Sequence, residues 1–482
     1  MFPPLQDLYR IAPELVLCGF GMLVMLLAPL VPRSRPAILP AISLVGAALA
    51  LAATFFPATN PGEAYSGLFR ADAFSLFVHW VVGGVAFLVI LGSMHYLERD
   101  HLDPGEFCAL VLLATAGMGV MAGAQELLTV FVGLEISSIS SYILASYRRD
   151  APRSNEAAMK YFLLGSFATA FFLYGIALTY GATGTTRLDA MAAASAGPGG
   201  ALLKMGVALM FVGIAFKVAA APFHLWAPDV YEGAPAPVTA LLSTGPKAAA
   251  FAVALRILVN IGAAGELWFT ALWVASLLSM FAGNLAALVQ SNVKRMLAYS
   301  SIAHAGYILA AIAAAAGMDH VTGTAAALFY VATYAIVTLG AFLIVGQLGG
   351  SGERDLTFDD FAGLASRQPA LAACMSLFLL SLLGLPITAG FLGKFYVFNA
   401  TLKSGLVWLA VLVALNSVIA AYYYLRVIVA MYMREPEREI AVEAAPWTLA
   451  AALWLASAGT IYAGLFPGHI LAMATRAAIG MR

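Results

Sequence analysis

The stretch AFKVAAAPFHLWAPDVYEG, residues 215–233, places a lysine inside an apolar run and then interrupts the helix. Lys217 follows GVALMFVGIAF, where an ammonium group has no obvious water, and Pro222 comes five residues later. Because proline removes a backbone donor and frees carbonyl groups one turn back, the helix is expected to break there. In lipid, those carbonyl groups need water, side chains or neighbouring helices as partners. The stretch therefore predicts a buried cation beside polar backbone.

The composition of the chain indicates that its solvent is lipid. Of 482 residues, 62% are hydrophobic and 10% are charged, and the mean hydropathy is +0.90. Soluble domains carry about 25% charged residues. The net charge of zero gives no basic field to attract nucleic acid. Three cysteines, Cys18, Cys108 and Cys374, lie far apart and are too few for the four thiolates of an iron–sulfur cluster.

Apolar runs separated by short polar loops predict an all-α polytopic membrane protein with about fourteen transmembrane helices. The expected spans are 12–30, 38–56, 73–96, 107–124, 127–147, 156–181, 202–222, 238–261, 267–289, 297–316, 321–347, 370–399, 406–430 and 446–466.

The sequence also contains a faint internal repeat. The tripeptide SSI occurs at 137–139 and at 300–302, and prolines interrupt two spans at Pro222 and Pro386. Both features recur at nearly the same offset, which spans five helices and would therefore invert one copy across the membrane. Inverted repeats with one broken helix in each half are an architecture of transporters, with the ion site near the interruptions.

Lysine and arginine collect in cytoplasmic loops, so their distribution predicts the orientation. With both termini outside, the cytoplasmic loops hold twelve: Arg33, Arg35, Arg99, Arg148, Arg149, Arg153, Lys294, Arg295, Arg354, Arg367, Arg434 and Arg438. The other side holds seven: Arg10, Arg70, Arg187, Lys204, Lys403, Arg476 and Arg482. We therefore expect both termini on the outer face.

Four ionisable groups lie deep within expected spans: Glu135, Lys217, Lys247 and Lys394. A lysine at a helix centre costs about 2.5–3.5 kcal/mol on insertion scales, so each needs a partner or internal water. Glu135 and Lys247 lie about 12 and 14 Å into their spans at about 1.5 Å per residue. Permanent pairing that only holds helices together is the alternative. A Lys–Glu pair that parts and re-forms changes how readily the lysine holds its proton, as a proton relay requires.

Further polar residues are weaker candidates. His224 and His304 suit proton transfer because neutral imidazole both donates and accepts, but a packing role fits each equally well. Glu156 and Lys160, four residues apart at the start of a span, fit a stabilising helix-end pair, with a secondary proton-input role as the alternative. One charged group is expected to form a solvated loop: Glu353, Arg354, Asp355, Asp359, Asp360 and Arg367.

Several motifs resemble the antiporter-like, proton-pumping subunits of respiratory complex I, NADH:quinone oxidoreductase. The stretch KVAAAPFHLWAPDVYEGAPAPVTALLSTGPK, residues 217–247, looks most like the N subunits, the counterparts of mitochondrial subunit 2. Other matches are NEAAMKYFLLGS at 155–166, KRMLAYSSIAHAGY at 294–307 and GLPITAGFLGKFYVF at 384–398. The resemblance covers about residues 70–430.

The resemblance implies fourteen helices with two inverted five-helix repeats, each with one broken helix. It divides the chain into three N-terminal helices (1–100), a first antiporter-like repeat (107–261), a second (267–430) and a C-terminal helix with a tail (446–482). In this arrangement Glu135 pairs with Lys217, Lys247 is the central relay and Lys394 is the exit-side residue. His224 and His304 are further members of the polar axis.

The resemblance also implies the surroundings of the chain. It is expected in the bacterial cytoplasmic (inner) membrane beside other membrane subunits of complex I, including neighbouring antiporter-like subunits. The chain itself is expected to carry no cofactor and no metal. NADH, flavin, iron–sulfur clusters and quinone belong to partner subunits, and the proton-translocating chain is part of their enzyme.

Two other functions fit parts of the sequence. A large subunit of a multisubunit sodium/proton antiporter shares much of the PFHxWxPD pattern and differs after it. A membrane cytochrome would use histidine pairs on haem, with His79, His95, His224 and His304 available. Haem ligation needs facing pairs on different helices, whereas His79 and His95 share one span, so this function is disfavoured.

Overall fold

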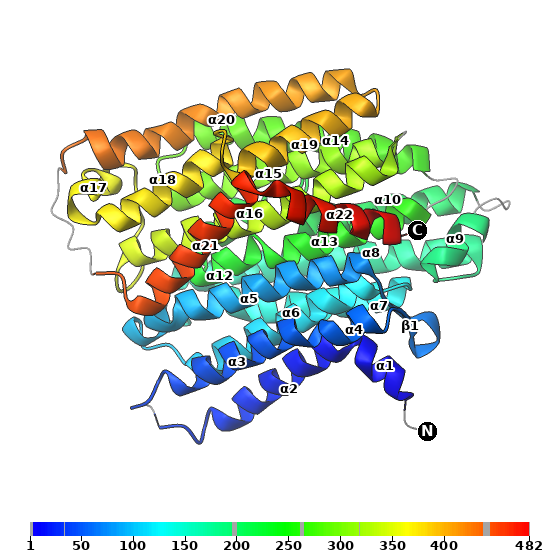
Figure 1. Ribbon diagram of the computed structural model, residues 1–482, viewed down its shortest axis with the longest axis horizontal. Helices are drawn as coiled ribbons and strands as arrows, with labels where there is room; N and C mark the ends of the chain where they lie inside the picture. Colours follow the sequence, from blue (N-terminus) through cyan, green and yellow to red (C-terminus); the bar gives the residue numbers. More distant parts are fainter. Residues whose placement is uncertain are drawn as a thin grey trace.

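The computed structural model describes residues 3–32, 34–194, 200–260, 265–317, 319–436 and 444–481. Arg33, Arg438 and Arg482, which contribute to the expected orientation, lie outside the described residues. Long helices run side by side through the molecule, as Figure 1 shows. The N- and C-terminal ends both lie toward the right of Figure 1, on the side of α9, and α17 lies at the opposite end.

The N-terminal region contains five helices and a small hairpin. The helices are α1 (Leu5–Arg10), α2 (Ala12–Leu27), α3 (Ile38–Ala53), α4 (Phe55–Thr59) and α5 (Ala73–Arg99). The strands β1 (Gly62–Ala64) and β2 (Phe69–Ala71) pair antiparallel on either side of a 3-10 turn, η1 (Tyr65–Gly67). Asp72 begins α5 with a reciprocal cap, in which it accepts from the Ser75 backbone and Ser75 accepts from its backbone.

The middle of the chain forms ten helices. They are α6 (Pro104–Gly123), α7 (Leu127–Ala145), α8 (Pro152–Thr183), α9 (Leu188–Ala194), α10 (Gly200–Lys217), α11 (Trp226–Gly233), α12 (Ala236–Leu242), α13 (Gly245–Asn260), α14 (Gly265–Leu288) and α15 (Val293–Ala315).

The C-terminal part adds α16 (His320–Gly349), the 3-10 turn η3 (Asp359–Phe361), α17 (Leu364–Arg367), α18 (Pro369–Leu383), α19 (Ala389–Lys403), α20 (Val407–Met433), α21 (Trp447–Leu465) and α22 (Pro467–Gly480). The expected tail after residue 466 is thus a helix. It packs against α5 and α16, and its first residue is a proline, which is favourable at that position.

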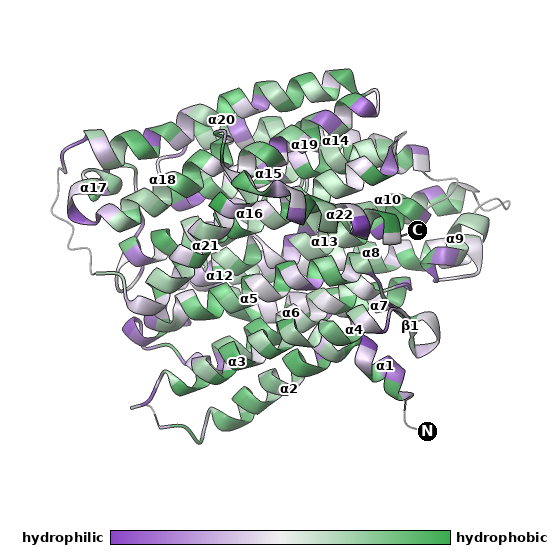
Figure 2. Ribbon diagram, in the orientation of Figure 1, coloured by the Kyte–Doolittle hydropathy of each residue, from purple (hydrophilic) through white to green (hydrophobic). Residues whose placement is uncertain are grey.

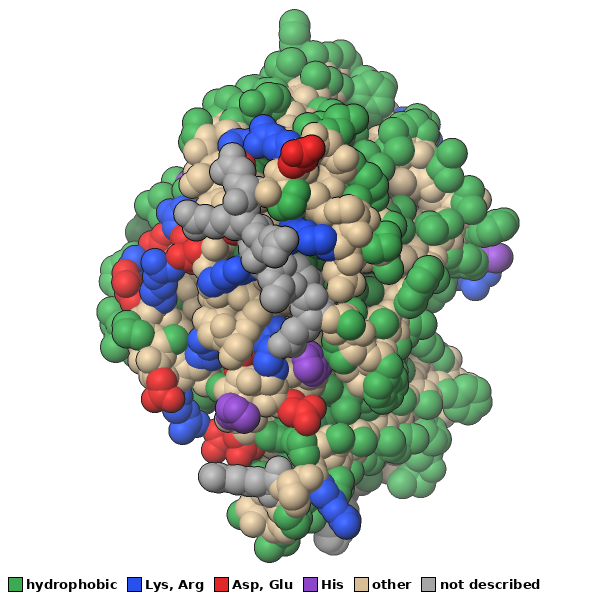
Figure 3. Space-filling model, turned by 90° about the vertical axis from the view of Figure 1, so that its left-hand side faces the viewer, with side chains coloured by type: hydrophobic (Ala, Val, Ile, Leu, Met, Phe, Trp, Pro, Cys, Tyr) green, Lys and Arg blue, Asp and Glu red, His purple; other side chains and the backbone are tan. Residues whose placement is uncertain are grey.

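Within the described ranges, twelve helical segments are long and apolar enough to cross a membrane, and α2 and α18 are shorter apolar helices. These segments confirm an all-α polytopic membrane protein. Figure 2 shows hydrophobic residues along the helices and hydrophilic residues gathered toward their ends. Figure 3 shows one end of the molecule, where charged side chains of both signs gather and hydrophobic side chains surround them.

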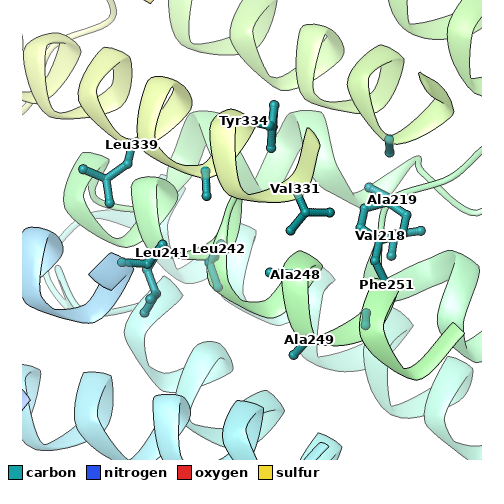
Figure 4. Close-up of a cluster of buried hydrophobic side chains, with 14 of the residues drawn as sticks. Val218, Ala219, Leu241, Leu242, Ala248, Ala249, Phe251, Val331, Tyr334 and Leu339 are labelled. Atoms are coloured by element: carbon teal, nitrogen blue, oxygen red, sulfur yellow. The ribbon is translucent and has the colours of Figure 1, made fainter. Parts of the chain in front are cut away.

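In the described residues, the helices are interrupted at the two expected places and also inside two other expected spans, 38–56 at Thr54 and 238–261 at Ser243–Thr244. The breaks near Pro222 and Pro386 separate α10 from α11 and α18 from α19. The expected span 238–261 corresponds to one segment long and apolar enough to cross a membrane, Ala236–Asn260, but within it α12 and α13 divide at Ser243–Thr244, which the sequence analysis does not expect. Pro246 has no N–H for the Leu242 carbonyl, which accepts the Tyr231 hydroxyl at 3.3 Å instead. Figure 4 shows apolar side chains from both sides of this break packed against α16.

Candidate functional site

The three intramembrane lysines are buried, as their positions in the sequence suggest. Lys217, Lys247 and Lys394 are 7%, 2% and 8% exposed. Lys217 is the last residue of α10, Lys247 is the third residue of α13, and Lys394 lies on α19 just after the second expected break. Each lysine therefore adjoins a different helix interruption.

Lys217 sits among aromatic rings. Its Nζ donates to the Tyr142 hydroxyl at 3.3 Å and lies 5.1 Å from the Tyr142 ring centre and 5.5 Å from that of Tyr161. Ring faces attract a cation, and the attraction is stronger where water is excluded. A cavity of about 10 Å³ adjoins the lysine and is lined partly by Ser137, Ser138 and Ser141. This is room for about one water molecule, with hydroxyl groups to hold it.

Glu135 does not form an ion pair with Lys217 in this structure. Among the ion pairs of the described residues, with nitrogen–oxygen distances up to 4.0 Å, this pair does not occur, although the two charges interact electrostatically. The Glu135 Oε1 atom is buried without a hydrogen-bond partner in the described part of the chain. Tyr142, two turns further along α7, takes the place of the carboxylate beside the ammonium group. The structure therefore shows the two groups apart.

Lys247 contacts the middle of α15. Its Nζ donates to Ser301 Oγ at 2.5 Å and to the Ser301 carbonyl at 3.3 Å. The Tyr334 hydroxyl donates to the same Ser301 Oγ at 2.6 Å. The lysine is thus linked through a serine to a tyrosine on α16, and its Nζ lies 5.7 Å from the Tyr231 ring centre.

His304 continues this polar path one turn along α15. Its Nδ1 bonds the Tyr330 hydroxyl at 2.8 Å, and its Nε2 bonds the Tyr424 hydroxyl at 3.0 Å. The Tyr424 hydroxyl also bonds Ser300 Oγ. The His304 ring centre lies 5.2 Å from that of Tyr334, so the histidine adjoins the partners of Lys247. Hydroxyl groups and a neutral imidazole both donate and accept, so this path has the groups that proton transfer needs.

Lys394 forms the other end of the path. Its Nζ donates to the Leu383 carbonyl at 2.9 Å, at the end of α18, and lies 5.2 Å from the Tyr307 ring centre. Tyr307 accepts from the Asn284 amide at 3.2 Å, and Asn284 in turn accepts from the Tyr423 hydroxyl at 2.9 Å. Polar and aromatic side chains thus connect α15 to α19 and α20.

Two of the weaker candidates lie apart from this path. His224 is half-buried in the interruption between α10 and α11, and among the described residues it makes no hydrogen bond with the three lysines. Lys160 pairs with Glu156 at 2.8 Å near the start of α8, in accordance with the expected helix-end pair. Lys160 also pairs with Asp229 of α11 at 2.8 Å, which ties two helices together.

The expectation of a fully solvated loop after α16 is wrong for Glu353. Its carboxylate, 7% exposed, accepts from Lys294 Nζ at 2.6 Å and from the Tyr96 hydroxyl at 2.5 Å. It also accepts from the backbone N–H of Ala236 at 3.2 Å. Composition could not reveal this role, because the partners lie on three distant helices.

Sequence reasoning missed the hydroxyl partners of the lysines and two buried ion pairs. The polar spacing of α15, with Ser300, Ser301 and His304 on one side, is the signal that could have found some of them. The ion pairs are Arg256–Asp72 at 2.9 Å and His79–Glu14 at 2.6 Å, the second being an ion pair when His79 is protonated.

The hydrogen bonds of the histidine rings also test the alternative of a haem-binding cytochrome. His79 and His304 use both ring nitrogens in hydrogen bonds with protein groups, so neither ring has a nitrogen available for iron in this arrangement. Over the described ranges, no group of three or more His, Cys, Asp or Glu side chains is placed to hold a metal ion.

Comparison with known proteins places this architecture in a family. Residues 124–420 match the model described as "NADH:quinone oxidoreductase/Mrp antiporter, TM". NADH-quinone oxidoreductase subunit N 1 of Solibacter usitatus (strain Ellin6076) is 48% identical, over 99% of this chain and 98% of the relative.

Solved structures agree with this relationship. A chain of respiratory complex I from Thermus thermophilus with bound aureothin is 37% identical, with a TM-score of 0.82 over 96% of this chain and 99% of that one. A chain of the Mrp complex from Dietzia sp. DQ12-45-1b has a TM-score of 0.86 over 98% of this chain and 97% of that one, but at 22% identity it shows the shared fold alone. The chain belongs to the transmembrane family of NADH:quinone oxidoreductase and Mrp antiporter subunits.

Proposed function

We propose that this chain is subunit N of an NADH:quinone oxidoreductase and moves protons across the membrane through its buried lysines. The relatives named subunit N support the assignment. The observation that carries the mechanism is the placement of Lys217, Lys247 and Lys394, each buried and each beside a helix interruption. A lysine that only held helices together would not need to lie beside a helix interruption, yet all three lysines do.

The first step uses Glu135 as a switch for Lys217. When the carboxylate approaches, it stabilises the charged ammonium group, and when it withdraws, the lysine gives up its proton more readily. The structure shows the separated arrangement, in which Tyr142 holds the ammonium group and a water-sized cavity lies beside it. A proton released there would pass toward Lys247, because Pro246 of the same α13 turn lines that cavity.

The second step runs from Lys247 to Lys394. Lys247 bonds Ser301, which bonds Tyr334, and the Tyr334 ring adjoins His304. His304 bonds Tyr330 and Tyr424, and Tyr307 on the same helix faces Lys394. The hydroxyl groups and the neutral imidazole each donate and accept, so a proton can move along the hydrogen-bonded parts of this row. Between Tyr334 and His304, and between Tyr307 and Lys394, the contacts are through rings, so a water molecule would have to connect the groups there.

In this proposal the energy comes from partner subunits. We propose that NADH oxidation, the flavin, the iron–sulfur clusters and quinone reduction belong to them and that this chain carries no redox centre of its own. Its neighbours are the other membrane subunits, including related antiporter-like chains. The resemblance to complex I at 37% identity over nearly the whole chain supports this assembly.

We further propose the division into a region with three transmembrane helices (1–100), antiporter-like repeats 107–261 and 267–430, and a C-terminal transmembrane helix with a tail (446–482). The support is that one break with a nearby lysine lies in each proposed repeat, at α10–α11 and at α18–α19. In this proposal His224 is a branch of the relay at the first break, and Glu156 with Lys160 is a pair through which protons enter. His224→Asn should lower proton pumping, and normal pumping in that variant would remove the histidine from the relay.

The test of the proton relay is a double-mutant cycle on Glu135 and Lys217 in reconstituted vesicles. Each single alanine variant should lose most NADH-driven proton pumping, by about tenfold or more, while the complex assembles. A static pair instead predicts single variants that misassemble and a Glu135→Ala/Lys217→Ala variant that recovers pumping. Recovery in the double variant would overturn the relay, since no switching group would remain.

The orientation has its own test. We propose that the chain lies in a bacterial cytoplasmic membrane with the Arg148–Arg153 loop inside and both termini outside. The loops on the side of Arg148–Arg153 hold twelve basic residues and those on the other side hold seven, and basic residues collect on the cytoplasmic side. A single cysteine at residue 150, in a chain without Cys18, Cys108 and Cys374, should resist an impermeant reagent in right-side-out vesicles. Strong labelling of that variant, together with no labelling of a matched variant whose single cysteine lies near a terminus, would reverse the assignment.

A sodium/proton antiporter subunit is the competing assignment within the same family. Co-purification separates the two. Flavin and iron–sulfur subunits should accompany this chain as subunit N, and only other antiporter subunits should accompany the alternative.

A further inference from the structure

A second set of buried ionisable groups lies outside the lysine path, among α2, α5, α6 and α13. Glu14 on α2 is 5% exposed, and His79 on α5 is 6% exposed. The His79 Nε2 and Glu14 Oε1 atoms lie 2.6 Å apart, and His79 Nδ1 lies 2.5 Å from the Ser75 carbonyl. Because Nδ1 faces a carbonyl, it carries a proton, and a hydrogen on either Nε2 or Glu14 completes the second bond.

Two carboxylate oxygens of this set have no hydrogen-bond partner in the described part of the chain: Glu14 Oε2 and Asp72 Oδ2. A buried polar atom without a partner is costly, and in native proteins such atoms are bound to water or carry a proton. The orphaned Glu14 oxygen is therefore where a protonated carboxyl group or a water molecule would be accommodated.

The space for the pair depends on a glycine. A Cβ atom at Gly119 on α6 would lie 3.0 Å from both Glu14 Oε1 and His79 Nε2. These contacts are tighter than ordinary van der Waals distances, so any other residue at 119 would push one of the two groups away. Gly119 therefore lets α6 close over the pair.

The pair is connected to the helix of the central lysine. Arg256 lies nine residues after Lys247 on α13, about 14 Å along the helix axis. Its guanidinium group, 2% exposed, donates to Asp72 Oδ1 at 2.9 Å and to the Ala122 carbonyl at 2.7 Å. Asp72 is the N-cap of α5 and acts electrostatically on His79.

The charged and titratable groups that face the pair are few. Asp72 and, through it, Arg256 act from α5 and α13, and Arg70 lies 4.0 Å from Asp72. Cys18 lies one turn after Glu14 on α2 and interacts with it electrostatically. A change of charge at Glu14 or His79 would thus change the electrostatic energy of Asp72 and, through the Asp72–Arg256 ion pair, that of α13.

We infer that Glu14 and His79 form a proton-accepting site on the side of Lys247 where α13 ends and both termini lie. The inference rests on the proposed function. His79 keeps its Nδ1–H on the Ser75 carbonyl, and a hydronium ion from the water on that side donates the incoming proton: its O–H bond breaks as an O–H bond forms on Glu14 Oε1, with His79 Nε2 accepting that hydrogen. The site receives a proton when Lys247 releases one, and Arg256–Asp72 connects the two events electrostatically.

Glu14→Gln in the assembled complex tests this site. Glutamine keeps the size and an acceptor oxygen but does not exchange a proton. We expect the protons pumped per NADH to fall by about twofold or more, with the complex assembled and its thermal stability close to that of the parent. His79→Gln should have the same effect. Glu63→Gln, which alters an exposed carboxylate of the β1–β2 hairpin, is the matched control and should pump normally.

The outcomes separate the two proposals. If Lys247→Ala pumps normally, the lysine relay fails. If Lys247→Ala loses pumping but Glu14→Gln and His79→Gln keep it, only the second site is overturned. If both Glu14→Gln and His79→Gln fail to assemble, the pair only holds α2 to α5 and the inference is again overturned. Loss of pumping in both, with assembly intact and Glu63→Gln normal, supports it.

Discussion

The breaks beside Lys217 and Lys394 look alike in sequence but differ in how each holds its lysine. Both contain a non-glycine residue in the left-handed region, Ala219 with φ 56° and Ile387 with φ 79°. Such conformations are costly and persist where the surroundings impose them, often at functional sites. Each break therefore stores some backbone strain next to a buried cation.

The difference lies in the partner of each ammonium group. Lys394 donates to the Leu383 carbonyl, which the break leaves available. Near Lys217, the Phe216 carbonyl at the end of α10 already accepts the indole N–H of Trp226 at 2.9 Å and the backbone N–H of Ala219 at 3.0 Å. Lys217 is left with a tyrosine hydroxyl, ring faces and a water-sized cavity.

The two helix interruptions therefore hold their lysines in different ways. Backbone holds Lys394 in place, whereas Lys217 has only weak, adaptable contacts and is free to meet Glu135. We therefore expect Lys217 to be the switching residue and Lys394 to be the fixed terminal one.

The largest expected effect comes from removing either ammonium group. Lys217→Ala and Lys394→Ala should each reduce proton pumping by about tenfold or more, because a relay group worth about 10²–10⁴-fold is lost. Assembly should remain intact, as judged by co-purification of the partner subunits. A normal ratio of protons to electrons in Lys394→Ala would remove Lys394 from the path.

Arginine substitution should separate the two lysines. Arg keeps the charge but holds its proton permanently, so Lys217→Arg and Lys394→Arg should both transfer protons poorly. Lys394→Arg should also be the less stable variant, because its guanidinium group is too bulky for the single carbonyl that Lys394 meets. Equal thermal stability of the two variants would contradict the fixed state of Lys394.

A smaller effect is expected from Tyr142→Phe. The phenylalanine keeps the ring face but removes the hydroxyl that accepts from Lys217, a loss of about 1 kcal/mol. Lys217 should then shift toward Glu135, so the paired state is favoured. A free-energy difference of about 1 kcal/mol corresponds to about a fivefold change in the population of the two states, and pumping should slow by about that factor. Tyr161→Phe, whose ring also faces the lysine, is the control and should change the rate less. Pumping unchanged in Tyr142→Phe would show that the tyrosine does not hold the separated state.

The smallest effect is expected from Trp226→Phe. This change removes the indole N–H from the Phe216 carbonyl and should cost about 1 kcal/mol of stability. The Phe216 carbonyl would then accept only the backbone N–H of Ala219, at 3.0 Å, so one of its lone pairs becomes available to Lys217 and the lysine should switch more slowly. Thermal stability and pumping rate, measured on one preparation, check both parts. A lower stability with an unchanged rate would show that the carbonyl does not distinguish the two breaks.

Much of the site could be predicted from the chain alone. Lysine in an apolar run is rare enough that Lys217, Lys247 and Lys394 stand out, and Pro222 and Pro386 mark two breaks. The break between α12 and α13 was missed because the run stays largely apolar on both sides of Ser243, Thr244 and Pro246, so hydropathy shows one continuous span. The helix α22 was missed because its apolar content is too low for a span.

Sequence by itself determined that this chain folds in lipid, where most of its spans lie, and that Lys217, Lys247 and Lys394 are buried, whereas it did not show the burial of Arg256 and Lys294. These properties follow from local composition and from the high cost of charge in hydrocarbon. Only the tertiary structure decided the partners: Ser301 for Lys247, the Leu383 carbonyl for Lys394, and Tyr142 in place of Glu135 for Lys217. Hydrogen bonds reach about 3 Å, and residues this far apart in the chain come that close only once the helices are packed.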